Sequence, residues 1–230
     1  MNLLLLQIPT TTESSVVVTE KTLSVIDLIT SGGVGGNLVM GALGILSIFA
    51  IYILIERFSA IKKASREDEN FLKSIRNFVE AKDIEAAKTL CKNTDSPISR
   101  MIEKGVNRIN KPMTDISAAI ENQGKLEVFK MENNLANLAT ISGAAPMIGF
   151  LGTVIGMIVA FHEMASAGGN IDVEMLSKGI YTAMTTTVAG LVVGIIAFIA
   201  YNYLVSKVDK VVFMLEAKTT EFLDLLHHNE

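Results

Sequence analysis

Three long stretches without a charged residue constrain this chain more than any other feature. They span residues 28–55, 133–161 and 179–206, and none of them contains Asp, Glu, Lys, Arg or His. About 20 predominantly apolar residues suffice to cross the roughly 30 Å hydrocarbon core of a bilayer. The sequence therefore predicts three transmembrane helices, and this pattern excludes an ordinary soluble enzyme.

Composition narrows the function classes further. Charged residues make up 19% of the chain, compared with about a quarter in ordinary globular proteins. The formal net charge of −4 gives no basic excess for nucleic acid. The single cysteine, Cys91, cannot form an intramolecular disulfide, and we expect a packed, unreactive thiol there. The three stretches lack paired Asp, His-Glu or Ser-His residues, which excludes an intramembrane protease. We expect no enzyme activity, no metal site and no cofactor.

The distribution of basic residues predicts the orientation. Four of them closely follow the first stretch: Arg57, Lys62, Lys63 and Arg66. Three more follow the third stretch: Lys207, Lys210 and Lys218. The connection between the second and third stretches instead carries one lysine, Lys178, and three acids, Glu163, Asp172 and Glu174. Because Lys and Arg mark the cytoplasmic side, we expect the N-terminus and this connection outside.

These features divide the chain into seven segments. Residues 1–31 are periplasmic, and 20–31 is either a short amphipathic helix or a flexible tail. The others are transmembrane helix 1 at 32–56, a cytoplasmic helical domain at 57–132, transmembrane helix 2 at 133–162, a periplasmic loop at 163–178, transmembrane helix 3 at 179–206 and a cytoplasmic C-terminal helix at 207–230.

Helical spacing continues outside the membrane. Asp83 and Pro97 are placed to start two short helices, and Thr114 is predicted to cap a longer one that continues through Glu132 into the second span. The third span is predicted to continue into the tail, where a heptad-like seam comprises Val208, Val212, Leu215, Thr219, Phe222 and Leu226. Two helices of about 50 residues would reach roughly 75 Å. The predicted fold class is an all-α membrane protein with long cytoplasmic extensions, which assembles as a homo-oligomer.

Small residues form a narrow stripe on each of the last two spans. The stripe of the second span comprises Gly149, Gly152, Thr153, Gly156 and Ala160, and that of the third comprises Ala183, Thr187, Gly190, Gly194 and Ala197. Small residues allow helix backbones to approach closely in lipid. We therefore expect helix packing at the stripe glycines and at Pro146, which is also expected to kink its helix.

The threonines in these spans allow two interpretations. Each hydroxyl could bond the carbonyl four residues back and serve only packing. Alternatively, Thr153, Thr187, Thr182 and Thr186 form a polar pore lining or proton path, to which Thr185 adds a hydroxyl. A threonine cannot itself carry a proton at an accessible pKa. Since the spans hold no Asp, Glu or His, any proton carrier must come from another polypeptide.

Two of these spans resemble a known family. The run at 145–157, APMIGFLGTVIGM, resembles the second-span signature of the ExbB/TolQ/MotA proton-channel family. Residues 179–202, which end in Ala-Tyr-Asn, resemble its third span, and 55–58 resembles the end of its first. The likeness is greater to ExbB than to MotA, because MotA proteins carry four spans.

The resemblance implies an assembly with a partner. It implies a pentamer whose second and third spans line a pore around two single-span helices of ExbD/TolR type. The partner brings the protonatable aspartate, and Thr153 and Thr187 match the two family threonines that face it. In one respect the chain departs from the family pattern, because many members have a glutamate where Thr182 stands.

The resemblance also implies a function. The chain is expected in the bacterial inner membrane as a proton-channel, stator-like subunit that uses the proton motive force to energise outer-membrane transport through a TonB-type system. The alternatives are a TolQ-like subunit for envelope integrity or division, and a non-conducting structural scaffold. The expected partners are further copies of the chain, an ExbD/TolR-like protein with an intramembrane Asp, a TonB-like protein and lipid, but no nucleic acid.

Overall fold

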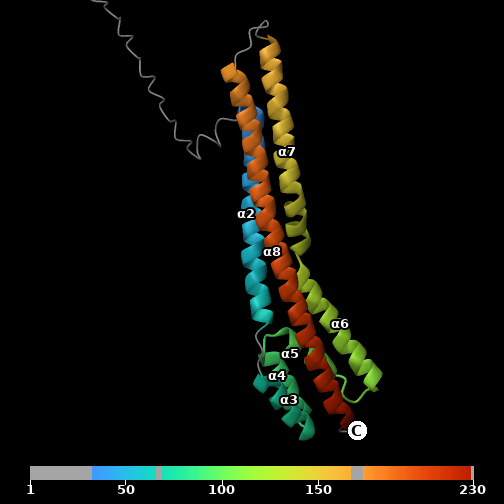
Figure 1. Cartoon of the computed structure of the whole chain (residues 1–230). Coiled ribbons are helices and arrows are strands. Elements are labelled where there is room, and N and C mark those ends of the chain that lie inside the picture. The colour runs from blue at the N-terminus through green and yellow to red at the C-terminus, as the bar shows by residue number, and fades with distance from the viewer. Residues whose placement is uncertain (1–32, 66–68, 167–172, 229–230) are drawn as a thin grey trace, which may run out of the picture.

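The structure is a computed structural model, and it describes residues 33–65, 69–166 and 173–228. All regular structure within these ranges is helical. Three long helices lie side by side in Figure 1: α2 (Gly33–Ala64), α7 (Leu135–Ser166) and α8 (Val173–His228). Each contains a segment long and apolar enough to cross a membrane, which confirms the prediction of three membrane-spanning helices. The segment at 20–31 lies outside the described residues.

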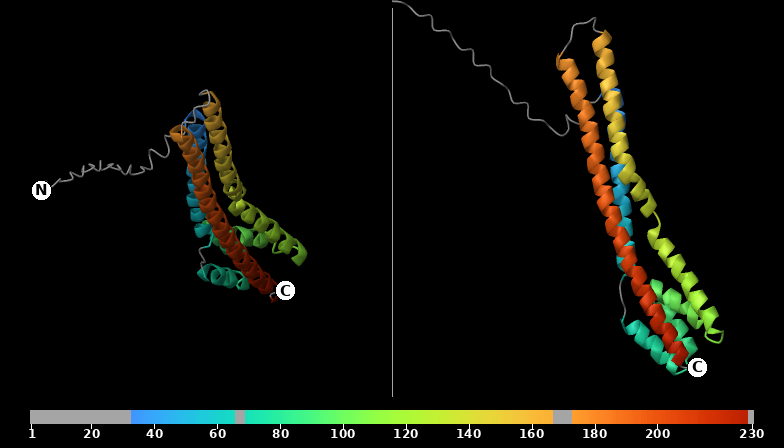
Figure 2. Two further views of the ribbon diagram at one scale, coloured as in Figure 1. Left: turned by 45° about the horizontal axis from the view of Figure 1, so that its top comes forward. Right: turned by 45° about the vertical axis from the view of Figure 1, so that its right-hand side comes forward.

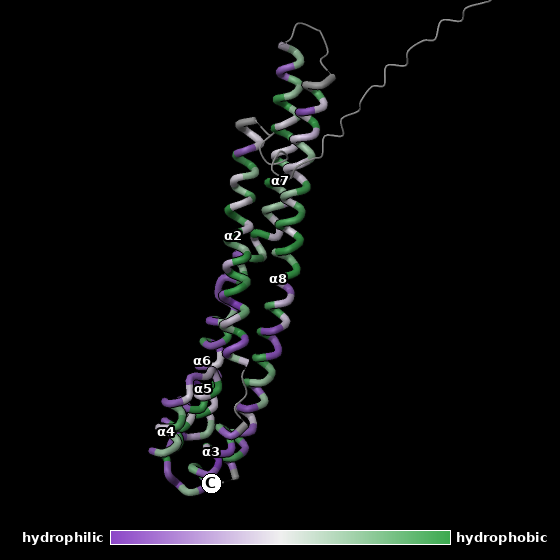
Figure 3. Tube along the Cα trace, turned by 90° about the vertical axis from the view of Figure 1, so that its left-hand side faces the viewer, coloured by the Kyte–Doolittle hydropathy of each residue, from purple (hydrophilic) through white to green (hydrophobic). Residues whose placement is uncertain are grey.

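Helix α8 connects the two ends of the molecule. Its 56 residues correspond to roughly 84 Å at 1.5 Å per residue. Figure 2 shows three short helices, α3 (Glu69–Glu80), α4 (Ile84–Asn93) and α5 (Pro97–Val106), gathered beside the C-terminal end of α8. In Figure 3 the upper parts of α2, α7 and α8 are mainly hydrophobic, and hydrophilic residues are frequent in the lower part. The third span therefore continues into the tail as predicted.

The seam of the tail packs against the short helices. Val208, Leu215, Phe222 and Leu226 are buried, and Val212 and Thr219 are half-buried. A Cβ added to Gly105 of α5 would lie 2.9 Å from Cε1 of Phe222. Phe222 of the seam thus packs against α5 within one chain.

Local sequence signals define the short helices. These are α3 (Glu69–Glu80), α4 (Ile84–Asn93) and α5 (Pro97–Val106). The side chain of Asp83 accepts a hydrogen bond from the Ala86 N–H at 3.0 Å, which confirms the predicted cap of α4. Pro97 occupies the first turn of α5, and Ser96 and Ser99 form a capping box there.

The prediction of one continuous helix from Thr114 into the second span is wrong. Helix α6 (Met113–Glu132) ends at an Asn-Asn pair, and α7 begins at Leu135. Asn134 has a φ of 65°, in the left-handed region that asparagine adopts more readily than most residues. Thr114 is not the cap either, since Pro112 holds the N-cap position and makes no side-chain bond. Figure 1 shows α6 leaving the direction of α7 at this break.

Helices also extend into the segment predicted as a loop at 163–178. Helix α7 runs to Ser166 and α8 begins at Val173, while Asp172 lies outside the described residues.

Helix α2 contributes one of its faces to the protein core. Val39, Leu43 and Ile53 are buried on that face, whereas the opposite face exposes bulky apolar side chains: Leu38, Ile45, Ile48 and Ile55.

Candidate functional site: the crossing of α7 and α8

The small stripes of α7 and α8 pack against each other within one chain. A Cβ added to Gly149 would lie 2.7 Å from the Thr186 carbonyl oxygen, and one added to Gly190 would lie 2.6 Å from the Ala145 carbonyl oxygen. A Cβ at Gly194 would lie 2.6 Å from Cγ of Pro146. These distances leave no room for a side chain. The two backbones therefore touch, as small residues permit in lipid.

The contact extends toward the N-terminal end of α8. A Cβ at Gly156 would lie 3.1 Å from Cβ of Ala183, and one at Gly179 would lie 2.5 Å from Cβ of Ala160. Gly179 was absent from the stripe predicted by sequence, although it stands four residues before Ala183 and continues the same spacing. Extending the spacing of the stripe by one helical turn toward the N-terminus would have identified Gly179.

Pro146 fits into this contact rather than standing apart from it. A proline has no N–H, so the Ser142 carbonyl lacks its usual helical donor. Helix α7 nevertheless continues through Pro146, and the Ser142 carbonyl oxygen lies 3.0 Å from the position of a Cβ on Gly194. The ring and the freed carbonyl therefore both face the glycine side of α8.

Three threonine hydroxyls gather at the closest point of the crossing. The hydroxyls of Thr186 and Thr187 each lie 3.2 Å from the Gly149 carbonyl oxygen, but that of Thr186 lies closer, at 2.8 Å, to the Ala183 carbonyl oxygen of its own helix. Thr153 is hydrogen-bonded to Thr187 across the two helices. Its distances to the carbonyl oxygens of Gly149 and Ala183 are both 3.4 Å, at the long limit for a hydrogen bond. The Thr153 proton is therefore not held by a short bond to the backbone.

The four predicted lining threonines do not share one accessible face. Thr186 is 1% exposed and Thr182 is 8% exposed. Both lie toward α2. A Cβ added to Gly36 of α2 would lie 3.2 Å from the Thr182 methyl carbon. Gly152, which contacts Thr186, also faces Val39 of α2. Thr153 and Thr187 are only half-buried. Thr185 is half-buried too, but its hydroxyl donates to the Tyr181 carbonyl oxygen of its own helix at 2.9 Å, so only Thr153 and Thr187 form a half-buried hydroxyl pair between the two helices.

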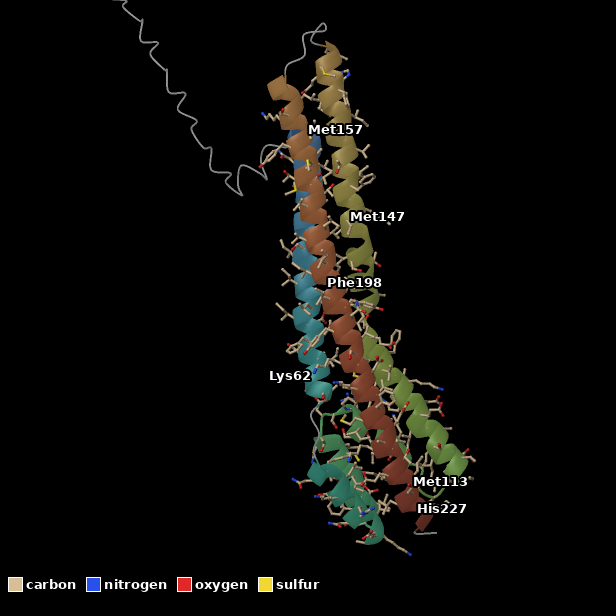
Figure 4. The ribbon with its side chains drawn as sticks, viewed as in Figure 1. Lys62, Met113, Met147, Met157, Phe198 and His227 are labelled. Carbon is tan, nitrogen blue, oxygen red and sulfur yellow. The ribbon has the colours of Figure 1, made fainter. Side chains whose placement is uncertain are left out.

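Large apolar side chains surround this pair without being covered by the chain itself. Phe150, Met184 and Leu191 are 63%, 62% and 45% exposed. Figure 4 shows Met147, which is 73% exposed, on the side of α7 that faces away from α8. Apolar faces of this size mark contact with lipid or with another protein.

No Asp, Glu, His, Lys or Arg belongs to the crossing, since 133–161 and 179–206 contain none. Within the described ranges, no three His, Cys, Asp or Glu residues are grouped so that they could hold a metal ion. A hydroxyl can donate one proton in a hydrogen bond and accept others, but it does not ionise in the working pH range. The crossing can therefore orient and stabilise a titrating group but cannot serve as one.

A charged network, which sequence reasoning missed, lies below the crossing. Glu127 of α6 is 2% exposed and accepts hydrogen bonds from Arg100 at 2.7 Å and from Lys130 at 2.9 Å. Burial raises the pKa of Glu127, but these hydrogen bonds outweigh it and hold the pKa below its usual value. Arg100 also reaches Asp95 at 2.7 Å.

The same network reaches the end of α2. Asp95 accepts a hydrogen bond from Lys63 at 2.5 Å, and Arg57 donates to the Lys130 carbonyl oxygen at 2.9 Å. The lower end of the first span is therefore joined to α5 and α6. The only sequence signal was local, namely the three-residue spacing of Glu127 and Lys130, which cannot reveal Arg100.

The crossing of α7 and α8 lies within the part of the chain that matches a known protein family. The model of the MotA/TolQ/ExbB proton channel family matches residues 93–217, which include all of α7 and the contact region of α8. The chain is 27% identical over 187 residues to a protein named as an ExbB homologue from Methanothermobacter thermautotrophicus, covering 81% of this chain and 64% of that one.

Bacterial relatives match over shorter lengths. A biopolymer transport protein ExbB of Helicobacter pylori is 40% identical over 34% of this chain and 54% of its own length. The Tol-Pal system protein TolQ of Haemophilus influenzae is 34% identical over 44% of each chain. This chain spans less than two thirds of the length of each of these three relatives.

Proposed function

This chain belongs to the MotA/TolQ/ExbB proton channel family, and on that premise we propose that it is a proton-channel subunit of an inner-membrane motor. The observation that carries the proposal is the Thr153–Thr187 hydroxyl pair, held between two touching backbones. The pair lies in a region that contains no Asp, Glu, His, Lys or Arg of its own. It is therefore suited to receive a carboxyl group from another chain.

The geometry gives each hydroxyl a role. The Thr187 hydroxyl can donate to the Gly149 carbonyl oxygen at 3.2 Å, and it is hydrogen-bonded to the Thr153 hydroxyl, where either of the two can donate. The Thr153 hydroxyl can rotate its proton toward an ionised carboxylate, and its oxygen can accept from the same group once protonated. A hydrogen bond to a charged group contributes about 1.5–3 kcal/mol, so the pair favours the ionised form when the carboxylate passes.

Assembly with further copies supplies the enclosure that one chain lacks. Three helices cannot enclose a polar lining away from lipid, and Phe150, Met184 and Leu191 remain exposed around the hydroxyl pair. We propose a homo-oligomer, with five copies expected from the family resemblance. An ExbD/TolR-like single-span partner would enter its pore and bring the aspartate.

The proposed orientation places the N-terminus and the connection at 163–178 in the periplasm. The basic residues below α2 and α8, among them Lys62 and Lys207, then lie in the cytoplasm. One elementary charge crossing 100 mV releases roughly 2.3 kcal/mol. A few protons therefore suffice to drive a conformational cycle.

Within the family we favour an ExbB-like role that energises outer-membrane transport through a TonB-type system. The ExbB names of the archaeal and Helicobacter relatives support this choice. The TolQ relative supports the alternative of an envelope-integrity or division motor. Expression of the chain with its single-span partner in strains lacking either system separates the two, because restored siderophore uptake supports the first and restored detergent resistance supports the second.

Proton flux tests the channel itself. The chain is reconstituted into liposomes with and without its single-span partner, and the acidification of an internal pH dye is followed after a potential is imposed. We expect flux only when both proteins are present. Absence of flux from a complex that is shown to be assembled would instead support the alternative of a structural scaffold.

A further inference from the structure

A basic pocket lies between α2 and α8 just below the apolar part of the two helices. It encloses about 390 Å³ and is lined by Phe58, Ile61, Lys62, Ser65, Tyr203, Leu204, Lys207 and Lys210. Three of these residues are lysines, and the others form a mainly apolar floor. Figure 4 shows Lys62 at the lower end of α2. The pocket therefore combines positive charge with an apolar surface at the level where the charge-free stretches end.

Two stacked aromatic rings shape the pocket. The ring centroids of Phe58 and Tyr203 are 6.3 Å apart with an interplanar angle of 23°. Nζ of Lys207 lies 5.5 Å from the centroid of the Tyr203 ring, within range of a cation–π interaction. Aromatic residues concentrate at the interface between hydrocarbon and water, so this pair marks that level. The cation–π contact also fixes one ammonium group inside the pocket.

The lysines of the pocket have no anionic partner among the described residues. No ion pair joins Lys62, Lys207 or Lys210 to a carboxylate within 33–65, 69–166 and 173–228, whereas the neighbouring Lys63 pairs with Asp95. Three lysines that line one small pocket give it a positive local potential. The pocket is therefore complementary to a compact group with negative charge, such as a phosphate.

Exposed apolar stripes lead directly into the pocket. On each helix the exposed residues follow at spacings of three and four: Ile51, Ile55 and Phe58 before Lys62 on α2, and Val192, Ile196, Ile199 and Tyr203 before Lys207 on α8. Residues at these spacings lie on one helix face. A molecule that fits the whole surface has a phosphate at one end and hydrocarbon chains about the length of half a bilayer at the other.

We propose that this pocket binds the headgroup of an acidic phospholipid from the cytoplasmic leaflet, with its acyl chains along the exposed stripes of α2 and α8. The apolar stripes select a lipid over free phosphate, because inorganic phosphate would leave them uncovered. The proposal rests on the proposed orientation but not on proton conduction. Lipid retention is measured without a proton gradient, so a failure of lipid binding can be distinguished from a failure of proton conduction.

The test is native mass spectrometry of the full-length protein. It is equilibrated in nanodiscs of equal amounts of phosphatidylcholine and phosphatidylglycerol, released, and scored for retained lipid. The pocket variant carries Lys62→Gln, Lys207→Gln and Lys210→Gln. The matched control carries Lys73→Gln, Lys104→Gln and Lys111→Gln, which remove the same charge from exposed sites on and near α3 and α5. A lysine near a membrane surface contributes about a fivefold gain in affinity for acidic lipid.

We expect the wild type and the control to retain phosphatidylglycerol preferentially, and the pocket variant to lose the preference by about fivefold for each lysine. Tyr203→Leu, which removes the ring under Lys207, should weaken it by a smaller factor. Equal retention by the pocket variant and the wild type would overturn the proposal, as would an equal loss in the control. Displacement of the lipid by inorganic phosphate would also overturn it, because the acyl chains would then contribute nothing.

Discussion

The upper and lower parts of this protein hold their helices together by different interactions. Where α7 crosses α8, glycines bring backbones into contact and hydroxyls bond to carbonyls, with no charge present. Below, Glu127 of α6 joins α5 through Arg100 and is also paired with Lys130 of its own helix, and α4 and α5 carry side-chain N-caps. In lipid there is no hydrophobic force between helices, so close packing must replace it. In water, ion pairs between helices are tolerated.

This difference bears on function. A crossing without charge can be packed to backbone contact, but it leaves the proton-carrying group to another chain. The charged lower part holds α5 and α6 to the end of α2 through Lys63 and Arg57. Variants in the two parts should therefore fail in different ways.

The largest effect is expected from Gly149→Leu. Its new Cβ would lie 2.7 Å from the Thr186 carbonyl oxygen, which cannot rotate away as a side chain can. Overpacking costs about 1–3 kcal/mol even where side chains can adjust, so we expect a cost at the upper end or above. Size-exclusion chromatography in detergent should show loss of the folded, assembled protein. The matched control is Gly143→Leu on the same helix, where a Cβ meets nothing within 4 Å; equal loss in both would show that the crossing is not close-packed.

The next effect is expected in the lower part. Glu127→Gln removes the carboxylate that pairs with Arg100 and Lys130. Because these partners are partly solvated, we expect a loss of about 2 kcal/mol rather than the larger cost of a fully buried pair. Thermal unfolding of the full-length protein measures it. Glu121→Gln, which affects an exposed pair with Lys125, should leave the melting temperature unchanged.

The same carboxylate predicts a dependence on pH. The pKa of Glu127 is lower in the folded protein than the ordinary value of 4.5, because the hydrogen bonds from Arg100 and Lys130 outweigh the raising effect of burial. The unfolded state therefore binds the proton first, and the stabilisation is complete above about pH 4.5 and is lost as the pH falls through the folded value. The difference in melting temperature between wild type and Glu127→Gln should shrink on acidification. A difference independent of pH would mean that the carboxylate is not ionised in the fold.

The smallest effect concerns Cys91, which is 2% exposed. Burial, with a smaller contribution from the charge of Glu103, raises the pKa of its thiol to about 12. Maleimide labelling of the native protein at neutral pH should therefore be slow and should become fast on unfolding. Thr89→Cys adds an exposed thiol on the same helix as a positive control. Labelling of Cys91 as fast as that of the added thiol would show that α4 is not packed as described.

Local features were predictable from the sequence, and contacts between distant segments were not. The charge-free stretches predicted the three spans, and Asp83 and Pro97 predicted two helix starts, because both signals act over a few residues. The break at Asn134 was missed, since asparagine also occurs within helices and its left-handed φ depends on the surroundings.

The site shows the same limit. Sequence spacing put Thr153 and Thr187 on stripes with the glycines, but it could not show that the two stripes meet within one chain. Nor could it distinguish these threonines from Thr182 and Thr186, which α2 covers. Periodicity within a helix does not show which of its faces a third helix covers, because that depends on the tertiary structure.

We infer that the Thr153 and Thr187 hydroxyls serve proton transfer rather than packing, and a measurement of proton flux separates these two roles. Proton flux into liposomes is compared for the assembled complexes of Thr153→Val, Thr187→Val and Thr185→Val. Valine keeps the volume and branching of threonine and removes only the hydroxyl. The Thr185 hydroxyl donates to the Tyr181 carbonyl of its own helix at 2.9 Å, so its loss is the matched control for packing. We predict that the first two variants assemble but lose flux and that the third conducts normally. Normal flux in both Thr153→Val and Thr187→Val would contradict the account.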